Sequence, residues 1–247
     1  QVELATPTEE TIRAIDWHPR GKTALMVGDN GLMLRYVAED HSVTTVTGSS
    51  QLVNLDMAAI AWNAAGSYAY VAGESGYIWA YYEGQDGQGV FEIVNDQIGS
   101  DITDIACQEE AQLCAVTTET DGIALIDTNT NRTMYWIGGE DRRWLGVNCG
   151  EPVFNRCAAI GEGRAIGSLG LDLQQPEQST LFTQIIPNLG GEFTHIHKRA
   201  PGETLISMAP FQITAWDMSN AEAYEWVEYS DVSNASNALA GERLVGT

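Results

Sequence analysis

Two histidines that stand two residues apart, His195 and His197, are the side chains whose types and spacing are best suited to chemistry. In an extended strand, residues at i and i+2 point to the same side, so both imidazoles would face one site. The repeat described below adds polar candidates from other segments: Asp16, Asp104 and Asn148. Such a set could bind a divalent metal, act as general acid and base on a small substrate, or hydrogen-bond to itself and to water.

A repeat of about 45 residues is what would bring these positions together. The stretch AIDWHPRGKTALMVGDNG, from Ala14, returns as AIAWNAAGSYAYVAGESG, from Ala59. Further copies begin at Asp104, Gly146 and Phe193. Each unit contains four short runs of alternating apolar residues, separated by turns rich in Gly, Asn, Asp or Pro, and this pattern predicts four strands per unit.

A four-stranded antiparallel sheet cannot bury both of its faces alone, so equal units must stack. Radial stacking predicts an all-β fold, a single β-propeller domain spanning residues 1–247. The expected blades are residues 11–50, 51–98, 99–141, 142–190 and 191–230. The first residues, QVELATP, would complete the last blade and close the ring. The last residues, NASNALAGERLVGT, are left over, and they are either an added closing strand or the opening of a sixth blade.

The units resemble the WD40-type repeat. The stretch IRAIDWHPRG, which starts at Ile12, is similar to the inner strand of that family, where apolar residues precede an SPDG turn. Trp216 and Asp217 stand at the usual Trp-Asp position, as Asp127 does in its own unit, although the histidine that often precedes the inner strand is missing. The resemblance runs to about Tyr229. It implies a propeller that serves as an interaction platform, on a fold that hosts many activities.

Four cysteines replace a tryptophan and an alanine of the repeat in two of its units. The inner strand turns into the second strand through four residues, so these positions should lie opposite each other, about 4.5 to 5.5 Å apart at Cα. The register predicts disulfides between Cys107 and Cys114 and between Cys149 and Cys157. Buried free thiols are the alternative, whereas a four-cysteine zinc site would need closer spacing. Disulfides imply export to an extracellular, periplasmic or cell-envelope location.

Alternation along the inner strand separates two faces. Ile15 and Trp17 are expected to face neighbouring blades, and Ala14 and Asp16 to face the opposite way, near the central channel. The corresponding polar residues would line that channel: Asp16, Asp104, Asn148, His195 and His197. A β-bulge would exchange the two faces.

A second ring is expected at the start of the inner strands, at one mouth of the channel. After Thr11 in the first unit, its members are Asp56, Asp101, Arg143 and Glu192. Such a ring could recognise a cation or a polar partner, and its ordinary alternative is a solvated rim.

The charge of the chain limits its partners. With 34 acidic and 12 basic residues, the net charge is -22, which would repel nucleic acid and anionic membranes. No stretch approaches the roughly 20 apolar residues of a membrane helix. The start, QVELATPTEE, lacks the regions of a signal peptide, so export would require a signal outside this sequence. Only two lysines accompany the acidity, which suits a halophilic or marine protein or an ordinary acidic secreted one.

The sequence favours a binding or scaffold module over an enzyme. We expect a monomer that binds a protein or carbohydrate partner without a cofactor. Exposed aromatic residues such as Tyr81, Tyr82, Trp79, Trp136 and Trp144 could form a platform, although alternation would place half of them between blades. The alternatives are a metal-binding propeller, with a divalent ion in the central channel, and a glycan-active hydrolase that uses channel residues. For a hydrolase, two or three carboxylates should converge with a raised pKa on one of them, and Asp16, Asp104 and His195 are the candidates.

Overall fold

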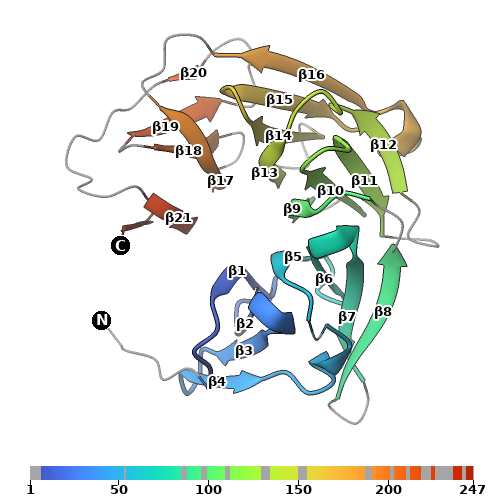
Figure 1. Ribbon diagram of the computed structural model, residues 1–247, viewed down its shortest axis with the longest axis vertical. Helices are drawn as coiled ribbons and strands as arrows, with labels where there is room; N and C mark the ends of the chain where they lie inside the picture. The colour runs from blue at the N-terminus through green and yellow to red at the C-terminus, as the bar shows by residue number, and fades with distance from the viewer. Residues whose placement is uncertain are drawn as a thin grey trace. The chain divides into compact units, whose positions relative to one another are not determined.

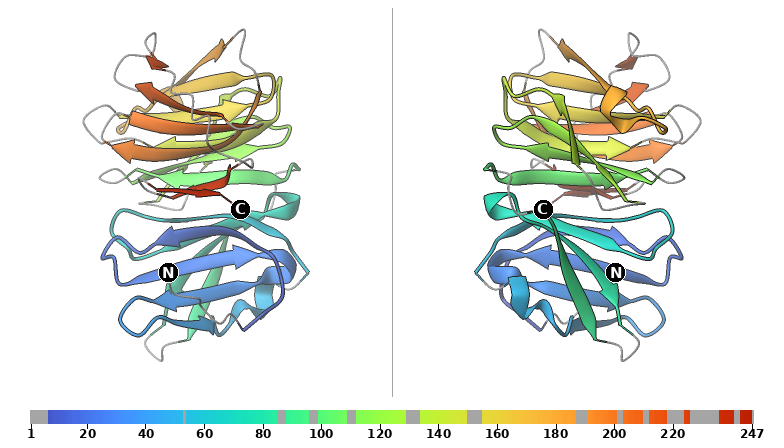
Figure 2. Two further views of the ribbon diagram at one scale, coloured as in Figure 1. Left: turned by 90° about the vertical axis from the view of Figure 1, so that its left-hand side faces the viewer. Right: turned by 90° about the vertical axis from the view of Figure 1, so that its right-hand side faces the viewer.

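Five antiparallel β-sheets of four strands each make up most of the protein (Figure 1). The structure is a computed structural model, and it describes residues 7–52, 54–84, 88–95, 99–108, 112–128, 134–149, 155–186, 191–200, 203–209, 212–217, 224–225, 236–240 and 243–246. Within each sheet the strands pair in chain order. Figure 2 shows the sheets from two further sides. The prediction of an all-β fold with five four-stranded sheets is confirmed.

The strand bounds follow the repeat. The first sheet contains β1 (Ile12–Trp17), β2 (Thr23–Gly28), β3 (Met33–Val37) and β4 (Ser42–Thr45). The second contains β5 (Met57–Trp62), β6 (Ala69–Gly73), β7 (Ile78–Glu83) and β8 (Gly89–Asn95). The third contains β9 (Ile102–Cys107), β10 (Leu113–Thr118), β11 (Ile123–Asp127) and β12 (Met134–Gly138). The fourth contains β13 (Trp144–Cys149), β14 (Arg156–Gly161), β15 (Ala165–Gly170) and β16 (Thr180–Ile185). The fifth contains β17 (Glu192–Ala200), β18 (Glu203–Ala209), β19 (Gln212–Asp217) and β20 (Tyr224–Glu225).

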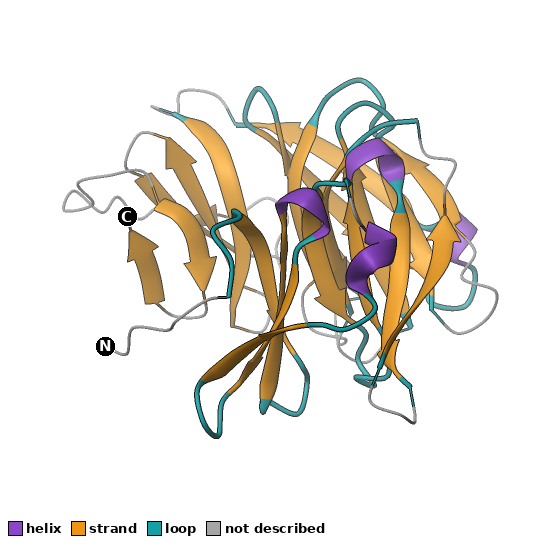
Figure 3. Ribbon diagram, turned by 60° about the horizontal axis from the view of Figure 1, so that its bottom comes forward, coloured by secondary structure: helices purple, strands orange, loops and turns teal. Residues whose placement is uncertain are grey.

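In the described part of the chain, helical residues occur only in short 3-10 turns (Figure 3). These are η1 (Asp29–Gly31), η2 (Ser49–Leu52), η3 (Glu74–Gly76) and η5 (Pro176–Gln178). The GDNG and GESG turns hold Asn30 and Ser75 in the left-handed region, at φ 55° and 58°. Among these helical residues, none forms a segment with the length and apolarity that a bilayer crossing requires.

In the first, second and fourth sheets, the first two strands have the register that the sequence predicts, with residues seven apart, or eight apart in the fourth sheet, directly paired. The pairs are Trp17 with Ala24, Trp62 with Ala69, and Cys149 with Cys157. In the fifth sheet the register differs, because Lys198 pairs with Thr204, six residues later instead of seven. The inner strand also carries a register shift near its start in four sheets. It falls between Ile12 and Ala14, Met57 and Ala59, Trp144 and Gly146, and Phe193 and His195.

The chain divides into two compact units, residues 1–105 and 106–247. In the first unit, side chains of the first and second sheets share one apolar core, which includes Leu25, Met33, Met57, Val71 and Tyr81. The second unit has a core of residues from the third and fourth sheets, and another of residues from the fourth and fifth. Neighbouring sheets in each unit therefore cover each other's apolar faces, as stacking requires.

The residues left over after the fifth sheet form a hairpin, β21 (Ser236–Ala240) and β22 (Arg243–Gly246). β21 lies beside β17 and β18, just as β17 lies beside β13 and β14, and β5 beside β1 and β2. In the second and fifth sheets, the first strand lies beside the first two strands of the sheet before it. The hairpin lies in this same position beside the fifth sheet. This arrangement favours the opening of a further sheet over a single closing strand.

The glycine that ends the second strand is required by a close backbone approach. A Cβ on Gly73 would lie 2.1 Å from Asp56 O, and a Cβ on Gly28 would lie 1.9 Å from Thr11 O. We expect Gly73→Ala to lower the free energy of unfolding by about 2 kcal/mol or more, because the backbone must shift to admit the methyl group. Urea titration monitored by circular dichroism measures the effect.

Gly21→Ala is the matched control. Gly21 has φ +69° and nothing within 4 Å of an added Cβ, so only the left-handed backbone opposes the change. Its expected cost is about 1 kcal/mol. If both variants unfold at the same urea concentration, the close approach at Gly73 does not explain the glycine of the repeat.

Candidate functional site

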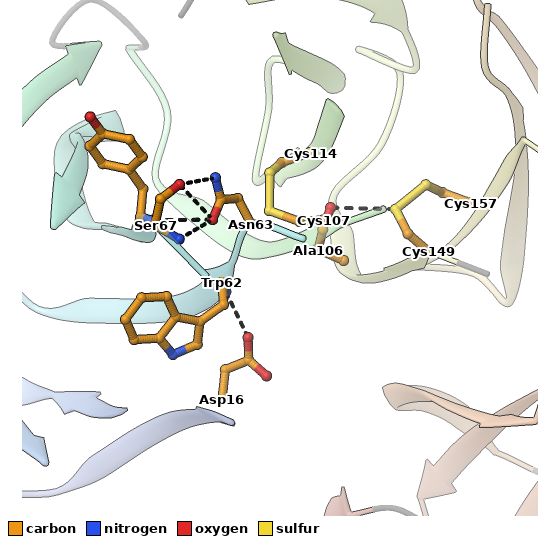
Figure 4. Close-up of a disulfide and its surroundings, with 10 residues drawn as sticks. Asp16, Trp62, Asn63, Ser67, Ala106, Cys107, Cys114, Cys149 and Cys157 are labelled. Carbon is orange, nitrogen blue, oxygen red and sulfur yellow. Dashed lines mark hydrogen bonds between the residues drawn. A yellow bond between two sulfur atoms is a disulfide. The ribbon is translucent and has the colours of Figure 1, made fainter. Parts of the chain in front are cut away.

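Asp16 faces the second sheet. Its Oδ2 accepts a hydrogen bond from the Trp62 amide on β5 at 2.7 Å (Figure 4). Burial raises the pKa of the Asp16 carboxyl to about 6, while hydrogen bonds from the Trp62 and Trp17 amides oppose the rise. The carboxylate therefore links two neighbouring inner strands, and its burial accounts for its raised pKa.

The predicted faces of the inner strand need a correction. Ile60 packs in the core shared with the first sheet and so faces a neighbouring sheet, as expected, whereas Ile15 and Trp17 of the first sheet are 54% and 48% exposed. Ala14 packs against that same core from the first sheet, and Asp16 binds the second sheet, so the opposite face is also covered by a neighbour. Both faces pack because the sheets are stacked face to face, and alternation alone did not separate core from channel.

The remaining channel candidates lie on three other inner strands. Asp104, on β9, accepts a hydrogen bond from the Ile105 amide at 2.8 Å. Asn148, on β13, pairs with Ala158 and is half-buried. His195 has an exposed side chain, although loss of hydration lowers its pKa, and His197 is half-buried. They pair with Ser207 and Leu205 of β18.

A shared axial site of Asp16, Asp104, Asn148, His195 and His197 stays a prediction, because the first two residues belong to one unit and the other three to the other. In the portion of the chain that the structure describes, no group of three His, Cys, Asp or Glu side chains is arranged to hold a metal ion. The divalent metal also stays a prediction.

Two of the predicted rim residues anchor a turn of the preceding sheet. Asp56 Oδ1 accepts from the Asn30 amide at 3.1 Å, and Asp101 Oδ1 accepts from the Ser75 amide at 2.8 Å. Asn30 and Ser75 are the left-handed residues of the GDNG and GESG turns, so each carboxylate stabilises a strained turn. A second contact on Asp56 comes from Arg13, whose Nη2 lies 3.3 Å from Oδ2.

At the equivalent position before the fourth sheet, an arginine replaces the aspartate, and its partner is an acidic side chain instead of a main-chain amide. Arg143 forms an ion pair with Glu119, which lies in the turn after β10, and a longer one with Glu162 at 3.8 Å. Glu192, at the start of β17, is exposed. Recognition of a cation or a polar partner by this rim stays a prediction, and structural contacts account for Asp56, Asp101 and Arg143.

Both predicted disulfides are present (Figure 4). Cys107 pairs with Cys114, and Cys149 with Cys157, with Cα atoms 3.9 Å and 4.0 Å apart, which is closer than expected. The second disulfide belongs to the core of the second unit. Cys149 Sγ lies 3.4 Å from Ala106 O, a contact without a hydrogen bond, since a disulfide sulfur carries no proton.

A pocket of about 310 Å³ lies between the first and second sheets, inside the first unit. Its lining includes His18, Arg35, Trp62, Tyr68, Tyr82 and Glu83. None of these was a site candidate from the sequence except Tyr82, as part of an aromatic platform. His18 belongs to a turn motif, and Arg35 and Glu83 are single charges on separate strands, so only the pairing of the sheets brings them together.

The polar groups of the pocket are held by neighbours. Arg35 Nη2 donates to Tyr81 Oη at 2.6 Å, and Nη1 forms an ion pair with Glu83. His18 Nε2 lies 3.0 Å from Gly66 O, and His18 Nδ1 accepts from the Arg20 amide at 3.0 Å. A neutral imidazole that accepts at Nδ1 carries its proton at Nε2, so His18 donates to Gly66. The donors and acceptors of the pocket are therefore oriented in advance.

The aromatic rings of the pocket are half-buried and packed edge to face. Trp62 lies 4.6 Å from the His18 ring, and Tyr68 lies 5.3 Å from Tyr82, between centroids. Asn63 Oδ1 accepts from the amides of Ser67 and Tyr68 and so fixes the turn that carries Tyr68. Within the described residues, the buried Trp62 Nε1 has no hydrogen-bond partner. An unpaired buried donor costs about 1 to 3 kcal/mol.

Comparison with known proteins identifies the architecture. No family model matches the sequence, and no curated protein matches it. Similar solved structures include one described as U3-55K, at TM-score 0.70 and 11% identity, and one described as RRP9 WD40 repeats, at TM-score 0.71 and 10% identity. Each alignment covers 87% of this chain, and this chain spans 63% and 62% of those chains. At this identity the likeness shows the fold, which is that of a WD40-type β-propeller.

Proposed function

We propose that this protein is a binding module of the β-propeller class that acts outside the cytoplasm, in an oxidising compartment. The observation that carries the binding role is the pocket of the first unit, which half-buried aromatic rings line together with the Arg35–Glu83 ion pair, whose arginine donates to the Tyr81 hydroxyl. Apolar walls with a few oriented polar groups are the usual construction of a recognition site. The two disulfides support the location, because such bonds persist in oxidising compartments.

The partner is expected to be a protein or a carbohydrate. A net charge of -22 disfavours nucleic acid and anionic membranes as partners. Screening the purified, oxidised chain against a peptide array and a glycan array tests the proposal. We expect at least one component to bind, with the signal reduced about tenfold in Arg35→Ala, since the pocket then loses its charged donor.

Arg20→Ala is the control for that experiment. Arg20 is exposed, and its contact with His18 uses the main-chain amide, so the variant keeps the pocket. The proposal is wrong if no bound component distinguishes Arg35→Ala from Arg20→Ala.

A glycan-active hydrolase is the second candidate, and the raised pKa of Asp16 is the observation that favours it. A carboxylic acid that stays protonated near neutral pH is what protonates the leaving group in glycoside hydrolysis. Both hydrogen bonds on Asp16 come from main-chain amides, so we prefer a structural role. Hydrolysis of nitrophenyl glycosides that Asp16→Asn abolishes, at unchanged folding, would reverse that preference.

A further inference from the structure

We infer that the pocket of the first unit binds a neutral pyranose sugar unit. This inference rests on the proposed binding function and names the ligand class of the same site. The argument uses the rings, the ion pair, the net charge and the size of the pocket, each of which restricts the ligand in a different way.

The rings restrict the shape of the ligand. Trp62, Tyr68 and Tyr82 line the pocket while remaining half-buried, so part of their apolar surface stays open to a ligand. A pyranose ring has a flat face of C–H groups surrounded by hydroxyls at its edge. Such a face packs on an indole or phenol ring and removes apolar surface of both from water, and Trp and Tyr supply this contact with little loss of side-chain entropy.

The ion pair restricts the polar groups of the ligand. Arg35 presents only donors and Glu83 only acceptors, and the two side chains lie together. A hydroxyl both donates and accepts, so neighbouring hydroxyls can bond to both residues at once. A proline-rich segment would also suit aromatic walls, but its main chain offers carbonyl acceptors and lacks amide donors for Glu83.

The charge of the site and of the chain selects against acidic sugars. Arg35 is neutralised by Glu83, so the pocket itself has little net charge. The chain as a whole carries -22, which disfavours a carboxylate or sulfate on the ligand. The expected ligand is therefore an uncharged sugar.

The volume limits the ligand to one or two sugar units. At about 310 Å³, the pocket is at the lower end of the range for small-molecule sites, about 300 to 1,000 Å³. A small contact area with few ordered partners predicts a dissociation constant of about 1 mM for a single sugar.

Titration of the oxidised chain with methyl glycosides of glucose, galactose and mannose, followed by isothermal calorimetry and ligand-observed NMR, tests the inference. Methyl glucuronide and decaproline are the comparison ligands. We expect at least one neutral glycoside to bind, and Tyr68→Ala and Glu83→Gln each to weaken it about tenfold. Glu83→Gln keeps the size and shape of the side chain, so a loss of binding in this variant is not a loss of folding.

Trp136→Phe, at an exposed position of β12 in the second unit, is the matched control and should not change the binding. The inference is overturned if no neutral glycoside binds, if the pocket variants bind as well as the control, or if the glucuronide binds more tightly. Pocket-dependent binding of decaproline alone would also overturn it, while leaving the proposed binding function intact.

Discussion

Loss of the two disulfides is expected to lower the free energy of unfolding by about 2 kcal/mol for each pair. The bridges join residues seven and eight positions apart, and closing loops of this length in the unfolded chain accounts for that amount. The Cys149→Ala/Cys157→Ala variant should lose more than Cys107→Ala/Cys114→Ala. Both of its sulfur atoms lie in the core of the second unit, where their removal leaves a cavity. Urea denaturation of each double variant measures the difference.

The repeat provides the matched control. In the second sheet, Trp62 and Ala69 occupy the paired positions that Cys107 and Cys114 occupy in the third. Cys107→Trp combined with Cys114→Ala should therefore recover part of the stability that Cys107→Ala/Cys114→Ala loses, because the indole restores the missing volume.

Mass spectrometry after alkylation tests the bonds directly. Without reductant the chain should take up no alkyl group, and after reduction it should take up four. Four groups taken up by the unreduced chain would contradict the pairing and remove the support for an oxidising compartment.

As the pH rises from about 4 to about 6, the free energy of unfolding should decrease because Asp16 loses its proton. Its pKa is about 6 in the folded chain, against about 3.9 in an unfolded one, so the folded state binds more protons in this window. Stability from this group is present below pH 4 and is lost as the pH rises through 6. The shift corresponds to about 3 kcal/mol.

Asp16→Asn tests this prediction. The amide oxygen can still accept from the Trp62 amide, and no charge has to be buried, so the variant should be the more stable protein at pH 7.5 and should lack the decline. Glu39→Gln, at an exposed turn position, is the control and should decline like the parent. Equal slopes for the parent and Asp16→Asn between pH 4 and pH 6 would show that Asp16 is not desolvated.

The sequence predicted the elements and the register of the sheets because these depend on short-range patterns. The pairing of Trp17 with Ala24 follows from the length of one turn, and this pairing also located the sulfur pairs. The sequence did not predict which face of the inner strand is buried, because Ala14 and Ile60, which belong to opposite faces, both pack against a neighbouring sheet. A period of two distinguishes two faces but does not say what covers each.

The pocket could not be predicted from the sequence because its residues are far apart in the chain. His18 and Gly66, and Arg35 and Tyr81, come into contact only when the first sheet packs on the second. The aromatic residues that the sequence singled out divide accordingly. Tyr82 lines the pocket and Trp136 is exposed, whereas Trp79, Tyr81 and Trp144 are buried and so do not form a platform.

The anchors between turns and inner strands also bear on how such a chain can be rearranged. Before the second and third sheets, Asp56 and Asp101 fit a turn that presents a main-chain amide, whereas before the fourth, Arg143 requires the acidic turn with Glu119. Shuffling the units by recombination would place arginine against an amide donor, or aspartate against a glutamate, at the new junctions. The residue before each inner strand therefore matches the turn of the preceding repeat, and a change in one of them requires a matching change in the other.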